Sequence, residues 1–218
     1  MWWKAFSVVL VLYAIAAGML VPLKPGITYV SPETAKTGQT VAIQLHGYNS
    51  FYTRSEPAGI RVWLEYDSLN AILGQNLYVL SDTTLEATFV FPNDLPRPSP
   101  SVMLNAIIDH PSDGVSLLPS ALELSRDTSA AASAANWAQN PISQLHIKSD
   151  FTFPYRNVIY ESIRNTYFHV PMWFALMFMF IASVVYSVRF LMNPQLDFDR
   201  RAAAYAETGL LFGILGLV

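Results

Sequence analysis

The sequence predicts a mixed fold class: a polytopic α-helical membrane protein with an inserted periplasmic β-sandwich of the immunoglobulin-like type. Of its 218 residues, 52% are hydrophobic and only 13% are charged, whereas an ordinary soluble domain has about 25% charged residues. Long apolar segments at 5–23 and 170–192 have the length of membrane-spanning helices. Short runs of β-branched and aromatic residues, separated by turn residues, fill much of the chain between them.

Charge and cysteine content exclude several kinds of function. The formal net charge is −3, so the chain has no basic surface of the kind that nucleic acid requires, and no nucleic-acid partner is expected. There is no cysteine, which excludes disulfides, thiolate metal sites and thiol catalysis by this chain. Gly-rich phosphate loops, nucleophile elbows and metalloprotease motifs are also missing from the sequence. We therefore expect no catalytic residues.

The first element is a predicted transmembrane helix within residues 1–24. Residues 5–23 contain no charge, and nineteen residues of helix span roughly 28 Å, close to the thickness of a bilayer core. A cleaved signal peptide is the competing interpretation, because the small residues of AIAAG offer a cleavage point. The second apolar segment requires a membrane in any case, which favours an anchor.

Residues 25–125 have the pattern of a β-sandwich. The runs TVAIQLHGY, IRVWLEYD, LEATFVF and SVMLNAIID are separated by segments rich in Pro, Gly, Ser and Asp. Several short strands at such spacing predict an antiparallel sandwich of the immunoglobulin-like type, without the disulfide of antibody domains. Its role is not indicated by the sequence; docking of a partner is one hypothesis.

Residues 126–168 are predicted to form a linker, with room for a short alanine-rich helix, followed by an amphipathic helix at the membrane surface. Residues 169–192 are the second predicted transmembrane helix. Its one charge, Arg189, lies near its end, and Trp173 at the opposite end suits the interfacial aromatic belt.

The end of the chain predicts a cytoplasmic loop at 193–201 and the start of a third transmembrane helix at 202–218. Cations near both apolar segments place the N-terminus and this loop in the cytoplasm, with residues 25–168 in the periplasm. The expected location is the bacterial inner membrane, with several passes. Because the third apolar segment has no polar exit, we expect the chain to be the N-terminal part of a longer membrane protein.

Among polar groups, His169 is the leading candidate for a ligand. Pro171 is suited to the first turn of a helix and Val170 is pushed away from helical angles, which places His169 at or just outside the helix N-terminus. There the helix dipole favours the neutral imidazole that binds metals. The alternative is a histidine that simply lies at the membrane interface. Arg164 has two interpretations: an ion pair with Glu161, or a contact with an acidic group of a ligand.

The remaining histidines have weaker patterns. His46 lies within a predicted strand, where a structural or exposed role is expected. His110 lies in the turn DHPSDG beside Asp109 and Asp113, an arrangement that is usually only a turn. His146 has no partner that the sequence reveals.

The stretch 163–174, IRNTYFHVPMWF, resembles the start of the second membrane helix in the haem-handling proteins of cytochrome c biogenesis, the CcmC/CcsA-type cytochrome c assembly family. The resemblance extends to WWKAFSVVLVLYAIAAGMLVPLKPGI at the N-terminus, which is similar to versions in Bacteroidetes-type bacteria, and to ETGLLFGILGLV at the end. In all it covers about a third of the chain. The sandwich segment has no counterpart in the family's short core.

The resemblance implies haem binding and transfer at the outer face of the inner membrane, by a haem-handling subunit more than by a turnover enzyme. His169 would be an axial ligand to the iron of a transiently held haem b, with the second ligand outside this chain. Arg164, Pro171 and Trp173 would complete the cofactor-binding residues. The implied partners are a periplasmic haem chaperone or apocytochrome c, other maturation subunits and the lipid bilayer. The alternative is a membrane-anchored binding or sensor protein whose sandwich is the recognition domain.

Overall fold

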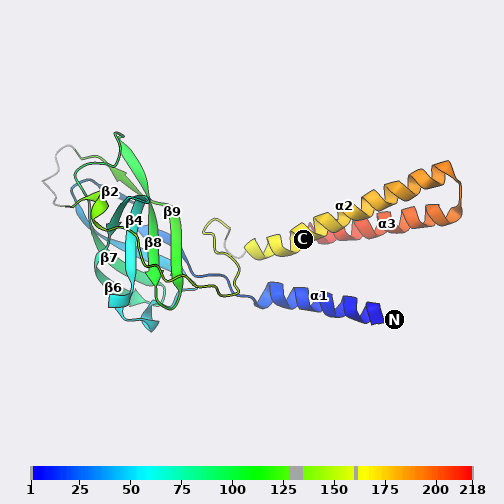
Figure 1. Cartoon of the computed structure of the whole chain (residues 1–218), viewed down its shortest axis with the longest axis horizontal. Coiled ribbons are helices and arrows are strands. Elements are labelled where there is room, and N and C mark those ends of the chain that lie inside the picture. The colour runs from blue at the N-terminus through cyan, green and yellow to red at the C-terminus, as the bar shows by residue number, and fades with distance from the viewer. Residues whose placement is uncertain (1, 128–134, 160–161, 218) are drawn as a thin grey trace. The chain divides into compact units, whose positions relative to one another are not determined.

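The computed structural model describes residues 2–127, 135–159 and 162–217. The chain divides into two compact units: a helical unit of residues 1–22 and 159–218, and a β-sandwich unit of residues 23–158 (Figure 1). The segment 128–134, where the short alanine-rich helix was expected, lies outside the described residues. The end of that predicted linker forms a single 3₁₀ turn, η3, at Trp137–Gln139.

The described part of the sandwich unit has nine strands in two sheets. Their bounds are Gly26–Ser31 (β1), Thr34–Lys36 (β2), Thr40–Tyr48 (β3), Arg61–Asp67 (β4), Asn70–Leu73 (β5), Gln75–Ser81 (β6), Thr84–Val90 (β7), Ser101–His110 (β8) and Gly114–Ser125 (β9). The four runs that the sequence predicted as strands correspond to β3, β4, β7 and β8. The β-branched and aromatic residues of these runs, bounded by turn residues, made them predictable, and β7 also alternates buried with half-buried positions.

One sheet has the order β1-β3-β7-β6 and the other β2-β9-β8-β4-β5. All pairs are antiparallel except β2 with β9, which run parallel. The central pair β3–β7 sets Ile43 opposite Ala87 and Leu45 opposite Leu85, so that both strands present their apolar side chains to the same face. Parallel pairing of the three-residue β2 has no local signature in the sequence.

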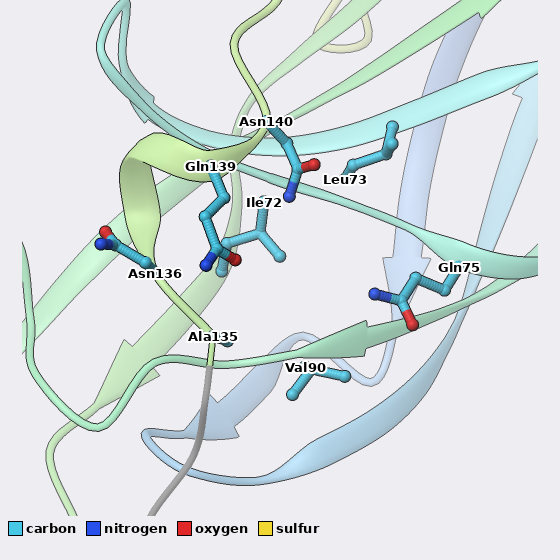
Figure 2. Close-up of a pocket in the computed structure, with 8 residues that line it drawn as sticks. All are labelled: Ile72, Leu73, Gln75, Val90, Ala135, Asn136, Gln139 and Asn140. Atoms are coloured by element: carbon cyan, nitrogen blue, oxygen red, sulfur yellow. The ribbon is translucent and has the colours of Figure 1, made fainter.

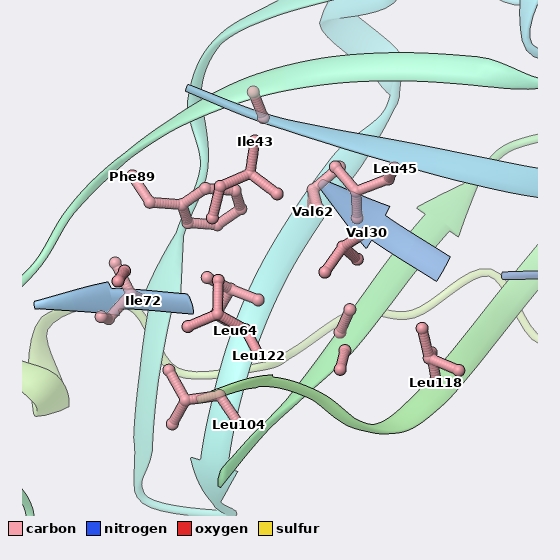
Figure 3. Packing of buried hydrophobic residues seen from close by; sticks show 14 of the residues in the cluster. Val30, Ile43, Leu45, Val62, Leu64, Ile72, Phe89, Leu104, Leu118 and Leu122 are labelled. Atoms are coloured by element: carbon pink, nitrogen blue, oxygen red, sulfur yellow. The ribbon is translucent and has the colours of Figure 1, made fainter. Parts of the chain in front are cut away.

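The core lies between the two sheets and is built from these inward-facing side chains (Figure 3). Ile43, Leu45 and Phe89 of one sheet and Leu64 and Leu122 of the other are fully buried. Trp137 of η3 adds to the core, and its indole Nε1–H donates to the carbonyl of Asp94 at 2.7 Å. The buried indole therefore has the hydrogen-bond partner that its N–H requires.

The helical unit contains α1 (Trp2–Leu20), α2 (Ser162–Met192) and α3 (Leu196–Leu215). Helices α2 and α3 form an antiparallel hairpin (Figure 1). The Leu176 side chain of α2 packs onto Gly213 of α3, where a Cβ would lie 2.6 Å from Leu176 Cδ1. Ser183 Oγ also donates to the carbonyl of Ala202 at 2.8 Å, which joins the two helices.

The predicted fold class, a polytopic α-helical membrane protein, is wrong. Within the described residues, α2 alone combines the length and apolar composition of a membrane span; the uncharged part of α1 is shorter. The first turns of α3 contain Asp197, Asp199, Arg200 and Arg201. The chain has a β-rich sandwich of nine described strands and a C-terminal helical hairpin. The prediction did not account for the charged first turns of α3 or for the shorter apolar part of α1.

Two helix boundaries also differ from the predicted ones. Helix α2 begins at Ser162 and continues through Pro171, so the amphipathic segment and the apolar segment are one helix. Helix α3 begins at Leu196 instead of residue 202. Asp197 explains this earlier start, because it pairs with Arg201 one turn later at 2.9 Å and lies near the positive end of the helix dipole.

Candidate functional site

His169 and Trp173 lie one turn apart on the same face of α2. Their ring centroids are 5.8 Å apart, with the ring planes inclined at 55°. His169 is exposed, and none of the described residues forms a hydrogen bond with its ring nitrogens. Trp173 is 41% exposed, and Val170, Phe174 and Met177 beside it are similarly accessible. The helix therefore presents an accessible imidazole at the edge of an apolar, aromatic surface.

The position of His169 along the helix differs from the prediction. It lies seven residues after Ser162, in the second turn, and is not at the N-terminus. The effect of the helix dipole is largely confined to the first turn, so this part of the prediction does not apply at the observed position of His169. Pro171 lies inside α2, where it removes one hydrogen bond from the helix. Its role is therefore not that of a helix-initiating residue.

Arg164 has a structural position that the sequence did not reveal. Its Nη1 donates to the carbonyls of Gly18 at 3.0 Å, Met19 at 3.3 Å and Val21 at 2.5 Å. These are the last carbonyls of α1 and the residue after it, and a cation there complements the helix dipole. The predicted alternative, a pair with Glu161, lies outside the described residues. Because α2 is continuous, Arg164 and His169 point about 140° apart and do not converge on one ligand.

The start of α2 is held in place by α1. Gly18 faces the ring of Phe168, and a Cβ on Gly18 would lie 2.2 Å from Phe168 Cζ. This contact and the bonds of Arg164 order residues 162–170 as helix. Tertiary packing thus outweighs the local tendency of Val170, the residue before proline, to leave the helical region.

A second polar cluster surrounds Asp109 in the sandwich unit. The side chain of Asp109 is fully buried. Its Oδ2 accepts from Arg61 Nε at 3.1 Å and lies 2.9 Å from His146 Nδ1, while Oδ1 accepts from the backbone N–H of His146 at 2.8 Å. Burial raises the pKa of Asp109, but the hydrogen bonds from His146 and Arg61 outweigh it, so the pKa lies below its ordinary value.

This cluster anchors the segment around residue 146 to the sheet. Arg61 also donates to the carbonyls of Ser143, at 3.0 Å, and Gln144. The contact of Nδ1 with the Asp109 carboxylate orients the His146 ring so that its Nε2 edge points away from the carboxylate, and the His146 side chain is 45% exposed. Sequence reasoning missed the pair because Asp109 and His146 are 37 residues apart, with no local pattern to link them.

His110 closes the β8–β9 turn. Its Nδ1 accepts the backbone N–H of Asp113 at 3.1 Å and lies 3.1 Å from Ser112 Oγ. Burial lowers its pKa, although the nearby Asp113 carboxylate acts in the opposite direction. Tyr52 packs edge-on against the ring at 5.7 Å, and burial raises the pKa of Tyr52 to about 12. These groups act as neutral turn and core residues, as the turn pattern suggested.

His46 has a structural contact as well, because its ring stacks on Tyr29 at 4.1 Å across the β1–β3 pair. No group of three or more His, Cys, Asp or Glu side chains suited to a metal ion occurs among the residues that the structure describes. A single imidazole such as His169 could still provide one ligand to a metal that is already held by a cofactor.

A shallow pocket of about 250 Å³ lies beside η3 and the edge strand β5 (Figure 2). The carboxamides of Gln75, Gln139 and Asn140 and the apolar side chains of Ile72 and Val90 line it. A fourth carboxamide, Asn136, instead caps the 3₁₀ turn by accepting the N–H of Ala138 at 3.1 Å. The pocket offers uncharged hydrogen-bonding groups, which suit a peptide or hydroxyl group better than an ion.

No family model and no curated protein matches this chain. Among solved structures it is similar to a superoxide reductase (neelaredoxin) from Ignicoccus hospitalis T24K, with 14% sequence identity and a TM-score of 0.31. The similarity covers 51% of this chain and 86% of that one. A likeness this weak carries no information about function.

Proposed function

We propose that the chain binds haem through His169 and takes part in haem transfer during cytochrome c maturation. One observation carries the proposal: α2 presents an accessible imidazole, without a hydrogen-bond partner among the described residues, beside Trp173 in an apolar surface. Neutral imidazole is a common axial ligand of haem iron. The resemblance of residues 163–174 to the CcmC/CcsA-type cytochrome c assembly family supports the same assignment.

The residues on α2 fit one face of such a cofactor. Trp173 and Val170 provide aromatic and apolar surface beside His169, which suits a flat macrocycle with an apolar body. Haem would supply the iron centre, and a second axial ligand would come from outside this chain. Arg164 does not fit the role of a propionate partner, because its guanidinium is engaged with the carbonyls at the end of α1.

In this proposal, α2 crosses the bacterial inner membrane and the sandwich unit lies on the periplasmic side. The length and composition of Ser162–Met192 support the span. His169 and Trp173 then lie near the outer headgroups, where an aromatic side chain is favoured. The chain would act as a binding and transfer subunit, with a periplasmic haem chaperone or apocytochrome c and other maturation subunits as partners.

Haem titration of the full chain in lipid nanodiscs tests the proposal. We expect a Soret band for the wild-type protein, and binding at least about tenfold weaker for His169→Gly, since a metal–ligand contact is lost. Added imidazole should restore the spectrum of that variant. His46→Ala is the matched control, because it also removes a histidine, but one that lies in the sandwich unit and outside the proposed haem site. Equal haem binding by wild type and His169→Gly would refute the role of His169.

A second function is favoured by the pocket beside η3 that is lined by the carboxamides of Gln75, Gln139 and Asn140, here called the carboxamide pocket. It is the predicted alternative, a membrane-anchored binding or sensor protein whose sandwich recognises a partner, with Gln139 and Asn140 as hydrogen-bonding groups. If the wild-type chain shows no Soret band at any haem concentration, this second function becomes the better explanation.

A further inference from the structure

A larger cleft, of about 580 Å³, lies within the sandwich unit. Three segments border it: residues 24–26, which lead into β1 and include its first residue, residues 115–119 of β9, and residues 154–158. Its volume lies in the range of small-molecule sites, which is about 300–1,000 Å³. It is separate from the carboxamide pocket beside η3, and no residue of the haem proposal lines it.

The borders of the cleft are fixed by hydrogen bonds and close packing. The backbone N–H of Lys24 donates to the carbonyl of Phe153 at 2.7 Å, and Ser116 Oγ donates to the carbonyl of Pro25 at 3.0 Å. The Tyr155 ring covers Gly26, where a Cβ would lie 1.8 Å from the ring. That ring also stacks on Tyr48, with centroids 5.3 Å apart. The cleft is therefore largely preformed.

The lining combines apolar side chains with two cations. Val115, Leu117 and Val158 provide apolar surface, and Lys24 and Arg156 provide positive charge. None of the described residues that line the cleft has a carboxylate. Neither cation forms a side-chain ion pair within the part of the chain that the structure describes. Arg61 and Lys148 differ in this respect, because they pair with Asp109 and Asp150.

We infer that this cleft binds a small amphipathic acid, with its acidic group at Lys24 and Arg156 and its apolar body against Val115, Leu117 and Val158. Two cations that border one cleft attract an anion, and a guanidinium can bind a carboxylate or phosphate with two hydrogen bonds. The apolar lining adds affinity for ligands whose acidic group is attached to hydrocarbon. The inference does not depend on haem binding.

The test uses 8-anilinonaphthalene-1-sulfonate, an aromatic probe with one sulfonate, and the full chain in nanodiscs of phosphatidylcholine. Calorimetry measures binding relative to empty nanodiscs. Octanoate, octanol and inorganic phosphate then compete with the probe. The test variant is Lys24→Glu/Arg156→Glu. The matched control is Lys36→Glu/Arg126→Glu, which makes the same change in net charge at exposed residues that do not line the cleft.

We expect the probe to bind at least about tenfold more weakly to the test variant than to wild type, since two charge-assisted contacts are lost. The control should bind as wild type. Octanoate should displace the probe at lower concentration than octanol or phosphate, because only octanoate combines an acidic group with a hydrocarbon chain. Equal weakening in both variants, or equal competition by octanol, would overturn the inference.

Two further arms complete the test. If charge reversal lowers the Tm of the test variant, Lys24→Gln/Arg156→Gln replaces it and should still weaken binding. Unchanged binding by the folded Gln variant would refute the role of these cations.

Nanodiscs that contain phosphatidylglycerol identify the source of the acid. Loss of probe binding there indicates a lipid headgroup, and unchanged binding indicates a free acid.

Discussion

Asp109 shows how a single buried charge organises the sandwich unit. Arg61 and His146 surround its carboxylate, and the hydrogen bonds that they donate lower its pKa despite burial. A buried ion that keeps several partners can be tolerated, whereas removal of one partner leaves an uncompensated charge. The network therefore joins the segment at 143–146 to β4 and β8 and identifies the Asp–His pair as structural.

His110 should make the stability of the sandwich depend on pH. Its pKa is lowered in the folded state, so the unfolded chain binds the proton more readily, and the free energy of unfolding should fall as the pH drops below about 6.5. Asp113 and Asp109 oppose this effect only in part. The slope can reach about 1.4 kcal/mol per pH unit.

Urea unfolding at pH 7.5, 6.5 and 5.5 measures this slope. His110→Asn is the control, because its carboxamide can accept the Asp113 N–H without titrating. A wild-type protein whose stability changes with pH no more than that of His110→Asn would contradict the prediction.

At the scale of elements, the contact between α1 and α2 depends on Gly18. Gly18→Ala should destabilise the helical unit by about 1–3 kcal/mol, because the new Cβ overlaps the Phe168 ring. A loss of stability would point to the overlap, since alanine is the better helix former by about 1 kcal/mol and would stabilise the helix at an exposed site. The Tm followed by far-UV circular dichroism measures the change.

A double-mutant cycle with Phe168→Leu provides the control for that prediction. Gly18→Ala should cost little once the smaller side chain is present, since the overlap is relieved. If Gly18→Ala were equally costly in both backgrounds, the contact would not be the cause.

The start of α2 is an element whose boundary depends on its neighbour. Val170-Pro171 favours a helix that starts near residue 171, but α2 already begins at Ser162. Arg164 and Phe168 contact α1, and these contacts keep the preceding turns helical. The position of His169 within the helix follows from these contacts with a segment about 150 residues earlier in the chain.

At the scale of the whole molecule, stability of the sandwich unit depends on the core between its sheets. Leu45 is fully buried at the centre of β3. Leu45→Ala should lower the free energy of unfolding by about 2–5 kcal/mol, since it leaves a cavity. Urea unfolding of the full chain, followed by tryptophan fluorescence, measures the loss.

Leu80→Ala on the edge strand β6 is the matched control, because Leu80 is 53% exposed. Its effect should stay within about 0.5 kcal/mol. Similar losses for the two variants would show that the space between the sheets is not the stabilising core.

The sequence by itself determined the local features: the apolar length of α2, and the strands β3, β4, β7 and β8, whose patterns repeat within a few residues. Only tertiary packing revealed the earlier start of α2, the engagement of Arg164 with α1, and the pairing of His146 with Asp109. It also brought Lys24 and Arg156 to one cleft. Sequence separation explains the difference: periodicity is encoded in neighbouring residues, whereas these contacts join groups that are 37 to 150 residues apart.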